Sequence, residues 1–112
     1  MDKITQYRQS VETVLSDFIA YISGSPSTTD RFMVADNEQD TYLVFDLGWQ
    51  KRHRIRSMPI LIRIINDKVW VEADNTDYIF VDRLLEAGIP KEDIVLAFHP
   101  PEMRKYTEFA VA

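Results

Sequence analysis

The residues best suited to chemistry in this sequence include a short run of cations. Lys51, Arg52, Arg54 and Arg56, with His53 among them, form the densest cluster of positive charge. Guanidinium groups bind phosphate oxygens through paired hydrogen bonds, so one interpretation is a nucleic-acid contact. The other is a solvated hairpin end or an edge strand protected by charge. Alternate arginines share one face of an extended segment, as a half-exposed strand requires, and we therefore favour the structural interpretation.

Acidic side chains form a second, more scattered set. Carboxylates can gather around Mg²⁺, as they do in nucleases. The candidates are Asp36, Glu38, Asp40, Glu72, Asp74 and Asp77. Their spacing resembles no calcium-binding loop, and turns and helix caps account for most of them. A small divalent-metal nuclease is therefore kept as an alternative function, and no metal ligand, cofactor-binding residue or catalytic residue is assigned.

Histidine and cysteine offer little further chemistry. The sequence has two histidines, His53 and His99, and no cysteine, which removes thiolate nucleophiles and zinc–cysteine clusters from consideration. The serines lack the sequence context of a nucleophile elbow. We expect His99, which precedes two prolines on an apolar tail, to pack against aromatic side chains. These observations favour a protein that is not an enzyme.

The charge balance bears on partners and compartment. The formal net charge is −5 over 112 residues, whereas affinity for DNA comes largely from neutralising phosphates with cations. We therefore expect any DNA contact to be weak or indirect. No apolar run approaches the roughly 20 residues that a membrane span needs, and the polar start lacks the apolar centre of a signal peptide. A cytoplasmic protein without a membrane segment is the expectation.

Hydrophobic periodicity predicts a helix over residues 3–22, because apolar side chains recur at steps of three and four. They are Ile4, Tyr7, Val11, Val14, Leu15, Phe18 and Ile22. Asp2 is the expected N-cap. The helix should end at the breakers of residues 23–26, and residues 24–30 should form a loop.

Four strands are expected in the middle of the chain, over residues 31–36, 41–49, 52–65 and 69–73. In the second strand Leu43 and Phe45 share a face with Leu47 and Trp49. Pro59 predicts that the third strand is an edge strand or carries a bulge. Short turns between successive strands predict an antiparallel meander.

A second helix is predicted over residues 77–87, with residues 74–76 as N-cap candidates and Gly88 as the C-cap glycine. The fold class is therefore α+β: an N-terminal helix, a four-stranded antiparallel meander, a second helix and an irregular apolar tail, in a single domain over 1–112. We expect eight side chains to share the core: Val14, Phe18, Leu43, Phe45, Ile60, Ile62, Leu84 and Leu85.

The tail is too apolar to remain in water. Residues 94–98 are continuously apolar, and we expect them to dock within the chain because an unanchored terminus is normally polar. Further on, Met103, Tyr106, Phe109 and Val111 continue the apolar pattern. These four are the candidate surface for self-association or for a partner.

The same tail carries a family resemblance. Residues 86–112, which include Gly-Ile-Pro-Lys-Glu-Asp-Ile-Val-Leu-Ala-Phe-His-Pro-Pro-Glu, resemble the end of the XisI-like proteins, named as controlling factors for excision of the fdxN DNA element in cyanobacteria. The start, with Tyr7-Arg8, and the segments 42–49 and 68–76 are similar to the family as well. One departure is Asn66-Asp67-Lys68, which stands where the family often has an Asp-Gly-Lys turn.

The resemblance implies an accessory role rather than an active site. It implies work alongside a recombinase and a second factor, XisH, which is thought to resemble endonucleases. The family offers no accepted catalytic residue to transfer. Three hypotheses follow: a protein-binding accessory factor of DNA excision, which we favour, the metal-dependent nuclease, and an antidote or chaperone to an XisH-like partner.

Overall fold

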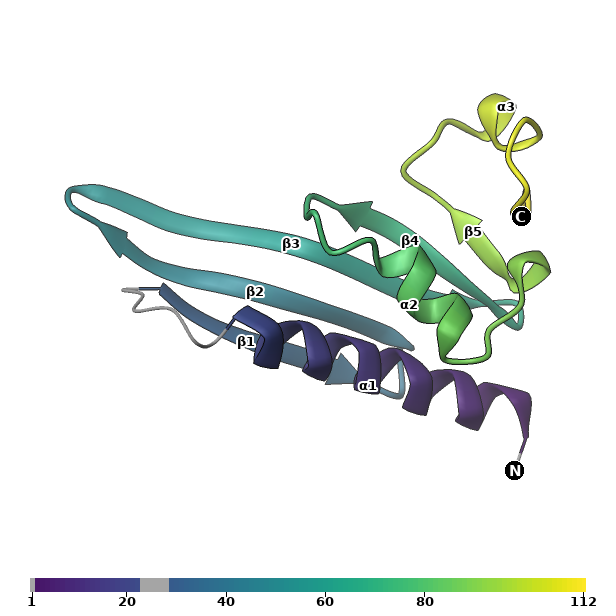
Figure 1. Ribbon diagram of the computed structural model, residues 1–112, viewed down its shortest axis with the longest axis horizontal. Helices are drawn as coiled ribbons and strands as arrows, with labels where there is room; N and C mark the ends of the chain where they lie inside the picture. The colour runs from purple at the N-terminus through teal and green to yellow at the C-terminus, as the bar shows by residue number, and fades with distance from the viewer. Residues whose placement is uncertain (1, 23–28) are drawn as a thin grey trace.

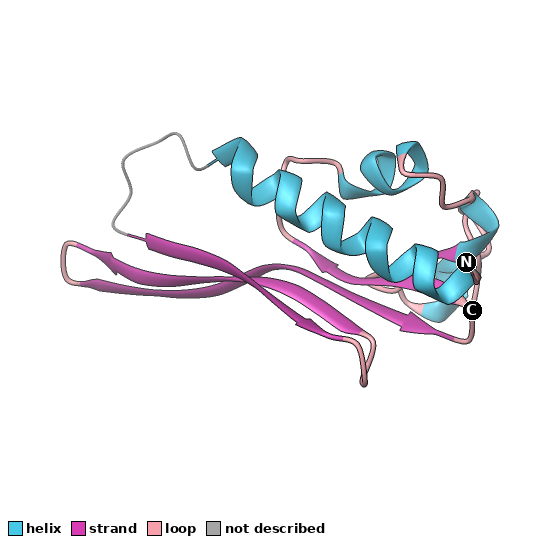
Figure 2. Ribbon diagram, turned by 90° about the horizontal axis from the view of Figure 1, so that it is seen from below, coloured by secondary structure: helices cyan, strands magenta, loops and turns pink. Residues whose placement is uncertain are grey.

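The computed structural model describes residues 2–22 and 29–112, apart from the side chain of Ile22. In this part of the chain a five-stranded sheet in the order β1-β2-β3-β4-β5 carries α1 and α2 on one face (Figures 1 and 2). The elements are α1 (Lys3–Ile22), β1 (Thr29–Asp36), β2 (Thr41–Gln50), β3 (His53–Ile65), β4 (Lys68–Asp74), α2 (Phe80–Glu86), the 3-10 turn η1 (Lys91–Asp93), β5 (Ile94–Leu96) and α3 (Pro101–Arg104). The α+β class is confirmed.

Helix α1 forms as its periodicity predicts. The Asp2 carboxylate accepts a hydrogen bond from the Thr5 backbone N–H at 2.8 Å, which confirms the N-cap. The buried side chains of α1 are Tyr7, Val11, Val14, Leu15 and Phe18. Ile22's side chain and most of the predicted loop, residues 24–28, lie outside the described residues. Thr29 and Asp30, also expected in that loop, belong to β1.

The antiparallel meander is confirmed for β1 to β4. The prediction of only four strands was wrong, because residues 94–96 form a fifth strand. β5 runs parallel to β4, with Val69 opposite Ile94 and Val71 opposite Leu96. A three-residue run has no readable period. Residues 94–96 form a strand because they pair with the free edge of β4. The connection through α2 returns the chain to that edge.

The face of β2 that meets the helices is the opposite of the predicted one. Tyr42, Val44 and Asp46 are buried beneath α1, so Leu43 and Phe45 point to the other side of the sheet, where they are only partly buried. Their assignment to the core was wrong. The other six predicted core residues pack as expected: five are buried, and Leu85 is partly buried against them.

Pro59 confirms one of its two predicted roles. β3 lies between β2 and β4, so it is not an edge strand. The register instead shifts where Val44 faces Ile60 and Asp46 faces Ser57, which leaves one more residue on β3 than on β2. This bulge accommodates a residue that has no N–H to donate to the ladder. The freed Pro59 carbonyl accepts a hydrogen bond from the Asn75 N–H at 2.8 Å.

Helix α2 is shorter than predicted and begins at Phe80. Its C-terminal end follows the expected glycine motif. Gly88 has φ 102°, and the N–H groups of Gly88 and Ile89 donate to the carbonyls of Leu85 and Leu84 at 3.0 and 3.1 Å. A glycine adopts this left-handed conformation without steric penalty. Ile89 is thereby turned back into the core, where it is 1% exposed.

The β2–β3 hairpin projects beyond the helices (Figure 1). The radius of gyration is 14.7 Å, compared with about 13 Å expected for a compact chain of this length.

None of the helices in the described residues has the length and apolar character that crossing a bilayer requires.

The orientation of β2 predicts unequal effects of two matched truncations. Ile62→Ala removes a fully buried side chain beneath α1 and should lower the free energy of unfolding by about 2–5 kcal/mol. Leu43→Ala removes an isomeric side chain from the opposite face and should cost less than about 1.5 kcal/mol. Urea unfolding in dilute solution measures both. An equal or larger loss for Leu43→Ala would contradict the observed register.

Candidate functional site

A cleft of about 610 Å³ opens between the C-terminal half of α1, the segment before α2 and strands β1–β3. Aromatic rings of Phe18, Tyr21 and Tyr78 line one wall, and polar groups of Ser57, Asn75, Thr76 and Asp77 line another. Its size lies within the range of small-molecule sites. It is therefore a candidate binding site.

The floor of the cleft is an ion pair. Arg31 on β1 donates to both oxygens of Asp46 on β2, at 2.5 Å from Nε and 2.7 Å from Nη2. The guanidinium also lies 4.8 Å from the centre of the Phe18 ring. Asp46 is 6% exposed, and a buried carboxylate requires such a partner. The pair is thus explained by its structural role.

The rim of the cleft is a tight turn in place of the predicted N-cap. The Asp74 carboxylate accepts hydrogen bonds from the backbone N–H and the hydroxyl of Thr76, at 3.0 and 2.7 Å. The chain then places the Tyr78 ring edge-on to Phe18, with 5.1 Å between ring centres. Ile79 takes the N-cap position with φ 59° and ψ 63°, a region that β-branched residues rarely occupy. The N-cap assignment to residues 74–76 was wrong.

The predicted carboxylate candidates do not converge. Within residues 2–22 and 29–112, no three histidine, aspartate or glutamate side chains are close enough to hold a metal ion. Asp36 caps its own turn by accepting from the N–H groups of Glu38 and Gln39. Asp40 holds Arg8 through two contacts of 2.7 and 3.3 Å. Turn and pairing duties thus account for Asp36, Asp40 and Asp74.

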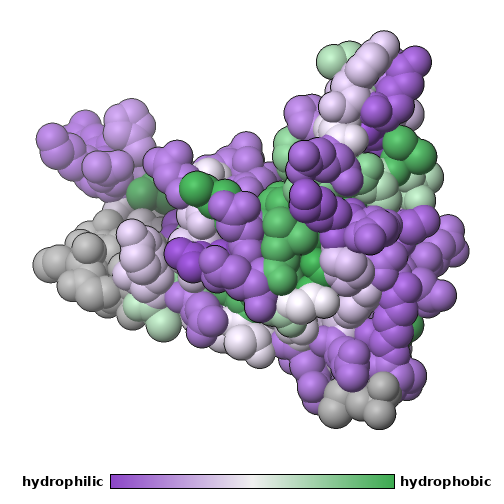
Figure 3. All heavy atoms as spheres, turned by 45° about the vertical axis from the view of Figure 1, so that its right-hand side comes forward, coloured by the Kyte–Doolittle hydropathy of each residue, from purple (hydrophilic) through white to green (hydrophobic). Residues whose placement is uncertain are grey.

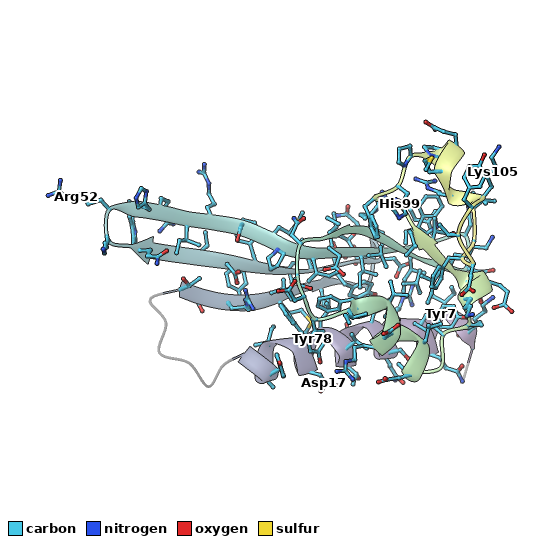
Figure 4. The ribbon with its side chains drawn as sticks, turned by 45° about the horizontal axis from the view of Figure 1, so that its top comes forward. Tyr7, Asp17, Arg52, Tyr78, His99 and Lys105 are labelled. Atoms are coloured by element: carbon cyan, nitrogen blue, oxygen red, sulfur yellow. The ribbon has the colours of Figure 1, made fainter. Side chains whose placement is uncertain are left out.

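The basic cluster lies at the far end of the β2–β3 hairpin, where Arg52 points away from the body of the molecule (Figure 4). Lys51 and Arg52 form the turn, while Arg54 and Arg56 lie on β3 opposite Trp49 and Leu47. Arg54 stacks on Trp49 at 5.2 Å. The structure therefore brings the four cations to one tip but separates Arg52 from the strand face on which it was predicted. The tip forms a hydrophilic projection in Figure 3.

The C-terminal tail is anchored and partly exposed. Arg104 donates to the carbonyls of His99 and Ala97 at 3.1 and 3.2 Å and lies over the Trp70 ring at 5.4 Å. Ala110 N–H donates to the Ile94 carbonyl at 2.9 Å. The resulting lobe stands out from the body at the upper right of Figure 3. His99 lies in this lobe with its ring 4.7 Å from that of Phe98.

The four candidate residues of the tail divide into two kinds. Phe109 packs against the core. Met103, Tyr106 and Val111 are 49%, 74% and 54% exposed. Apolar side chains held on an anchored segment are suited to binding a partner, because little flexibility is lost when they are covered.

One cluster of linked polar side chains was not predicted from the sequence. Tyr7 donates a short hydrogen bond to the Asp93 carboxylate, and Lys3 lies 2.8 Å from the same oxygen. Burial disfavours the charged carboxylate, but the hydrogen bonds from Lys3 and Tyr7 outweigh it and hold the pKa of Asp93 below its usual value. Burial and Asp93 together raise the pKa of Tyr7. The three residues tie the start of α1 to the turn before β5, and their separation of almost 90 positions concealed the link.

The hydroxyl of Tyr42 lies in a similar cluster at the β1–β2 turn. It donates to the Asn37 side-chain carbonyl at 2.7 Å. Burial, followed by the nearby Asp40 charge, raises the pKa of Tyr42 to about 12. Both tyrosines are therefore neutral donors at physiological pH, and neither is poised to act as a base.

The Asp93 cluster predicts a pH dependence of stability. Because the folded-state pKa is lowered, Asp93 contributes stability above its unfolded pKa of about 3.9, and this is lost as pH falls through the folded value. Asp93→Asn should lower the free energy of unfolding at pH 7 by about 1.5–3 kcal/mol and flatten its dependence on pH below about 4. Denaturant unfolding at a series of pH values measures both effects.

Glu108→Gln is the matched control, since its pair with Lys91 at 2.9 Å is largely exposed. It should cause almost no change. Equal effects of the two substitutions would show that the Asp93 cluster is not a special tether.

Comparison with known proteins adds what the geometry leaves open. A crystal structure of the fdxN element excision controlling factor XisI from Anabaena variabilis has a TM-score of 0.87 and 36% sequence identity, over 99% of this chain and 100% of that one. A XisI-like protein from the same organism has a TM-score of 0.91 and 29% identity, over 97% and 99%. No curated relative matches the chain. The family model described as XisI protein matches residues 1–111, and the chain therefore belongs to the XisI family.

Proposed function

We propose that this protein is a non-enzymatic accessory factor that controls excision of a DNA element. It acts by binding an XisH-like protein and a recombinase. Support comes from membership of the XisI family and from a relative of 36% identity named as an excision controlling factor. The buried ion pair of the cleft fits this proposal, because its structural role explains it.

The observation that carries the proposal is the anchored tail. Its exposed apolar residues, Met103, Tyr106 and Val111, stand on a segment held by Arg104 and by the Ala110 backbone. Binding such a preorganised surface orders few additional groups. Tyrosine is among the residues that contribute most at protein interfaces. The tail is therefore the surface we assign to the XisH-like partner.

The antidote or chaperone role requires the same contact with an XisH-like partner. It differs from the accessory role only in what the contact does to the partner's activity. If the partner cleaves DNA alone and loses that activity in the complex, this protein is an antidote. If the partner's activity persists or increases, it is an accessory factor. The nuclease hypothesis has no observation in its favour.

The tail assignment predicts the effect of one substitution on partner binding. Tyr106→Ala should weaken binding of a purified XisH-like protein at least tenfold, because it removes the most exposed aromatic ring of the lobe. Calorimetry with the full chain measures the change. Tyr21→Ala is the control, since Tyr21 is 75% exposed but lies at the far end of α1.

The control variant should bind as the unmodified protein does. Equal affinity of the Tyr106→Ala variant and the unmodified protein would remove the tail from the interface. If the unmodified protein does not bind an XisH-like partner, the proposed function itself fails.

The basic tip predicts weak DNA binding. The tip carries four cations, but the chain as a whole has a net charge of −5, which repels DNA phosphates. The isolated protein should therefore bind duplex DNA no tighter than about 10⁻⁶ M at physiological salt. Fluorescence anisotropy with labelled duplex measures this. Tighter binding that disappears in the Arg52→Glu, Arg54→Glu double variant would instead make the tip a DNA contact.

A further inference from the structure

The sheet face opposite α1 and α2 is apolar over its first three strands. We define the open face as Phe32 and Val34 on β1, Leu43, Phe45 and Leu47 on β2, and Leu61 on β3; these residues alternate with those buried beneath the helices. The Phe32 and Phe45 rings stack across the strands at 6.2 Å, and Val34 is 43% exposed. We propose that a second copy of this chain covers this face in an antiparallel, two-fold dimer.

The composition of the open face is unusual for a surface in contact with water. An antiparallel sheet with one solvated face normally carries polar side chains along that face. Here the middle of the face carries leucine, valine and phenylalanine, and the charged residues lie toward its two ends. Three strands of about eight residues cover roughly 400 Å² in projection. The largest apolar patch on a typical monomer is about this size, and such patches are often functional. The charged ends of the same three strands extend the surface toward the roughly 800 Å² per partner of a stable interface.

Charge at the two ends of the face selects a second copy as the occupant. The hairpin tip carries Lys51, Arg52, Arg54 and Arg56, and among the described residues Asp30 is the one carboxylate on that end of the face. At the other end, the β1–β2 and β3–β4 turns carry Asp36, Glu38 and Asp67, against Arg63 on β3 and Lys68 at the start of β4, whose ammonium donates to the Ala112 carbonyl. Each copy therefore has a positive and a negative end on the same surface.

This polarity fixes the arrangement of the dimer. A two-fold axis between the open faces and perpendicular to the strands puts the positive tip of each copy over the negative turns of its partner. An axis along the strands would put like charges together. The first arrangement is isologous, and the same contact is made twice.

Other occupants fit the face less well. The chain's own tail lies over β4, where Arg104 stacks on Trp70. A nucleic acid would meet Asp36 and Glu38 at one end and a net charge of −5 overall. The inference goes beyond the proposed function, because the tail surface and the open face share no residue and either can fail alone.

The first test is sedimentation equilibrium of the full chain up to sub-millimolar concentration. The unmodified protein should form dimers, and Leu43→Glu should raise the dimer dissociation constant at least tenfold. Ile79→Glu places the same charge on a 60% exposed apolar residue of the helix side and should leave the constant unchanged. Circular dichroism verifies that both variants are folded.

The second test uses the two charged ends. The tip variant (Arg54→Glu, Arg56→Glu) and the turn variant (Glu38→Lys, Asp67→Lys) should each be largely monomeric, because reversing either end makes both contacts repulsive. Mixed together, they should form a heterodimer, since every contact is then between opposite charges. Recovery on mixing also excludes unfolding as the reason for dissociation.

Three results would overturn the proposal. The first is an unmodified protein that remains monomeric at sub-millimolar concentration. The second is a dimer that persists in Leu43→Glu, which would place the contact elsewhere, for example along the free edge of β1. The third is the absence of a heterodimer in the mixture of the tip and turn variants.

Discussion

The pairing of Arg31 with Asp46 determines how the sheet meets the helices. Asp46 is the buried charged residue among those described, and its carboxylate is satisfied by a guanidinium that also packs on Phe18 of α1. Because side chains alternate along a strand, fixing Asp46 toward α1 also turns Tyr42 and Val44 inward and Leu43, Phe45 and Leu47 outward. A shift of β2 by one residue would exchange its two faces and leave the Arg31 guanidinium without a carboxylate partner. The net stability that such a buried pair contributes is small, because desolvation offsets much of the attraction.

This interaction explains what could and could not be predicted. The period of α1, the meander of β1–β4 and the glycine end of α2 depend on neighbours in sequence, and all were readable. The inward face of β2 was not, because both faces are apolar and the more hydrophobic one is the outer one. The deciding contact joins two strands and a helix. β5 was missed for the same reason, since three residues become a strand only against β4.

The candidate site was predictable in the same uneven way. The tail and the basic tip were recognisable by composition, and the structure places both at projecting ends of the molecule (Figures 3 and 4). The Asp93 cluster was not, although Tyr7 and Asp93 both lie in segments that resemble the family. Their contact shows that some recognisable positions serve the fold by joining α1 to the turn before β5. The family resemblance therefore locates the protein's role better than it locates the residues that perform it.

This register leaves one face of the sheet apolar and without a helix, and we claim that a second copy covers it. The most direct measurement is NMR of the Leu43 and Leu61 methyl groups with a soluble gadolinium chelate, which accelerates the relaxation of groups in contact with solvent. We predict protection in concentrated protein and its loss on dilution, while the Met103 methyl stays accessible throughout. Strong relaxation of Leu43 and Leu61 at every concentration would mean that the face is open to solvent, and the claim would be wrong.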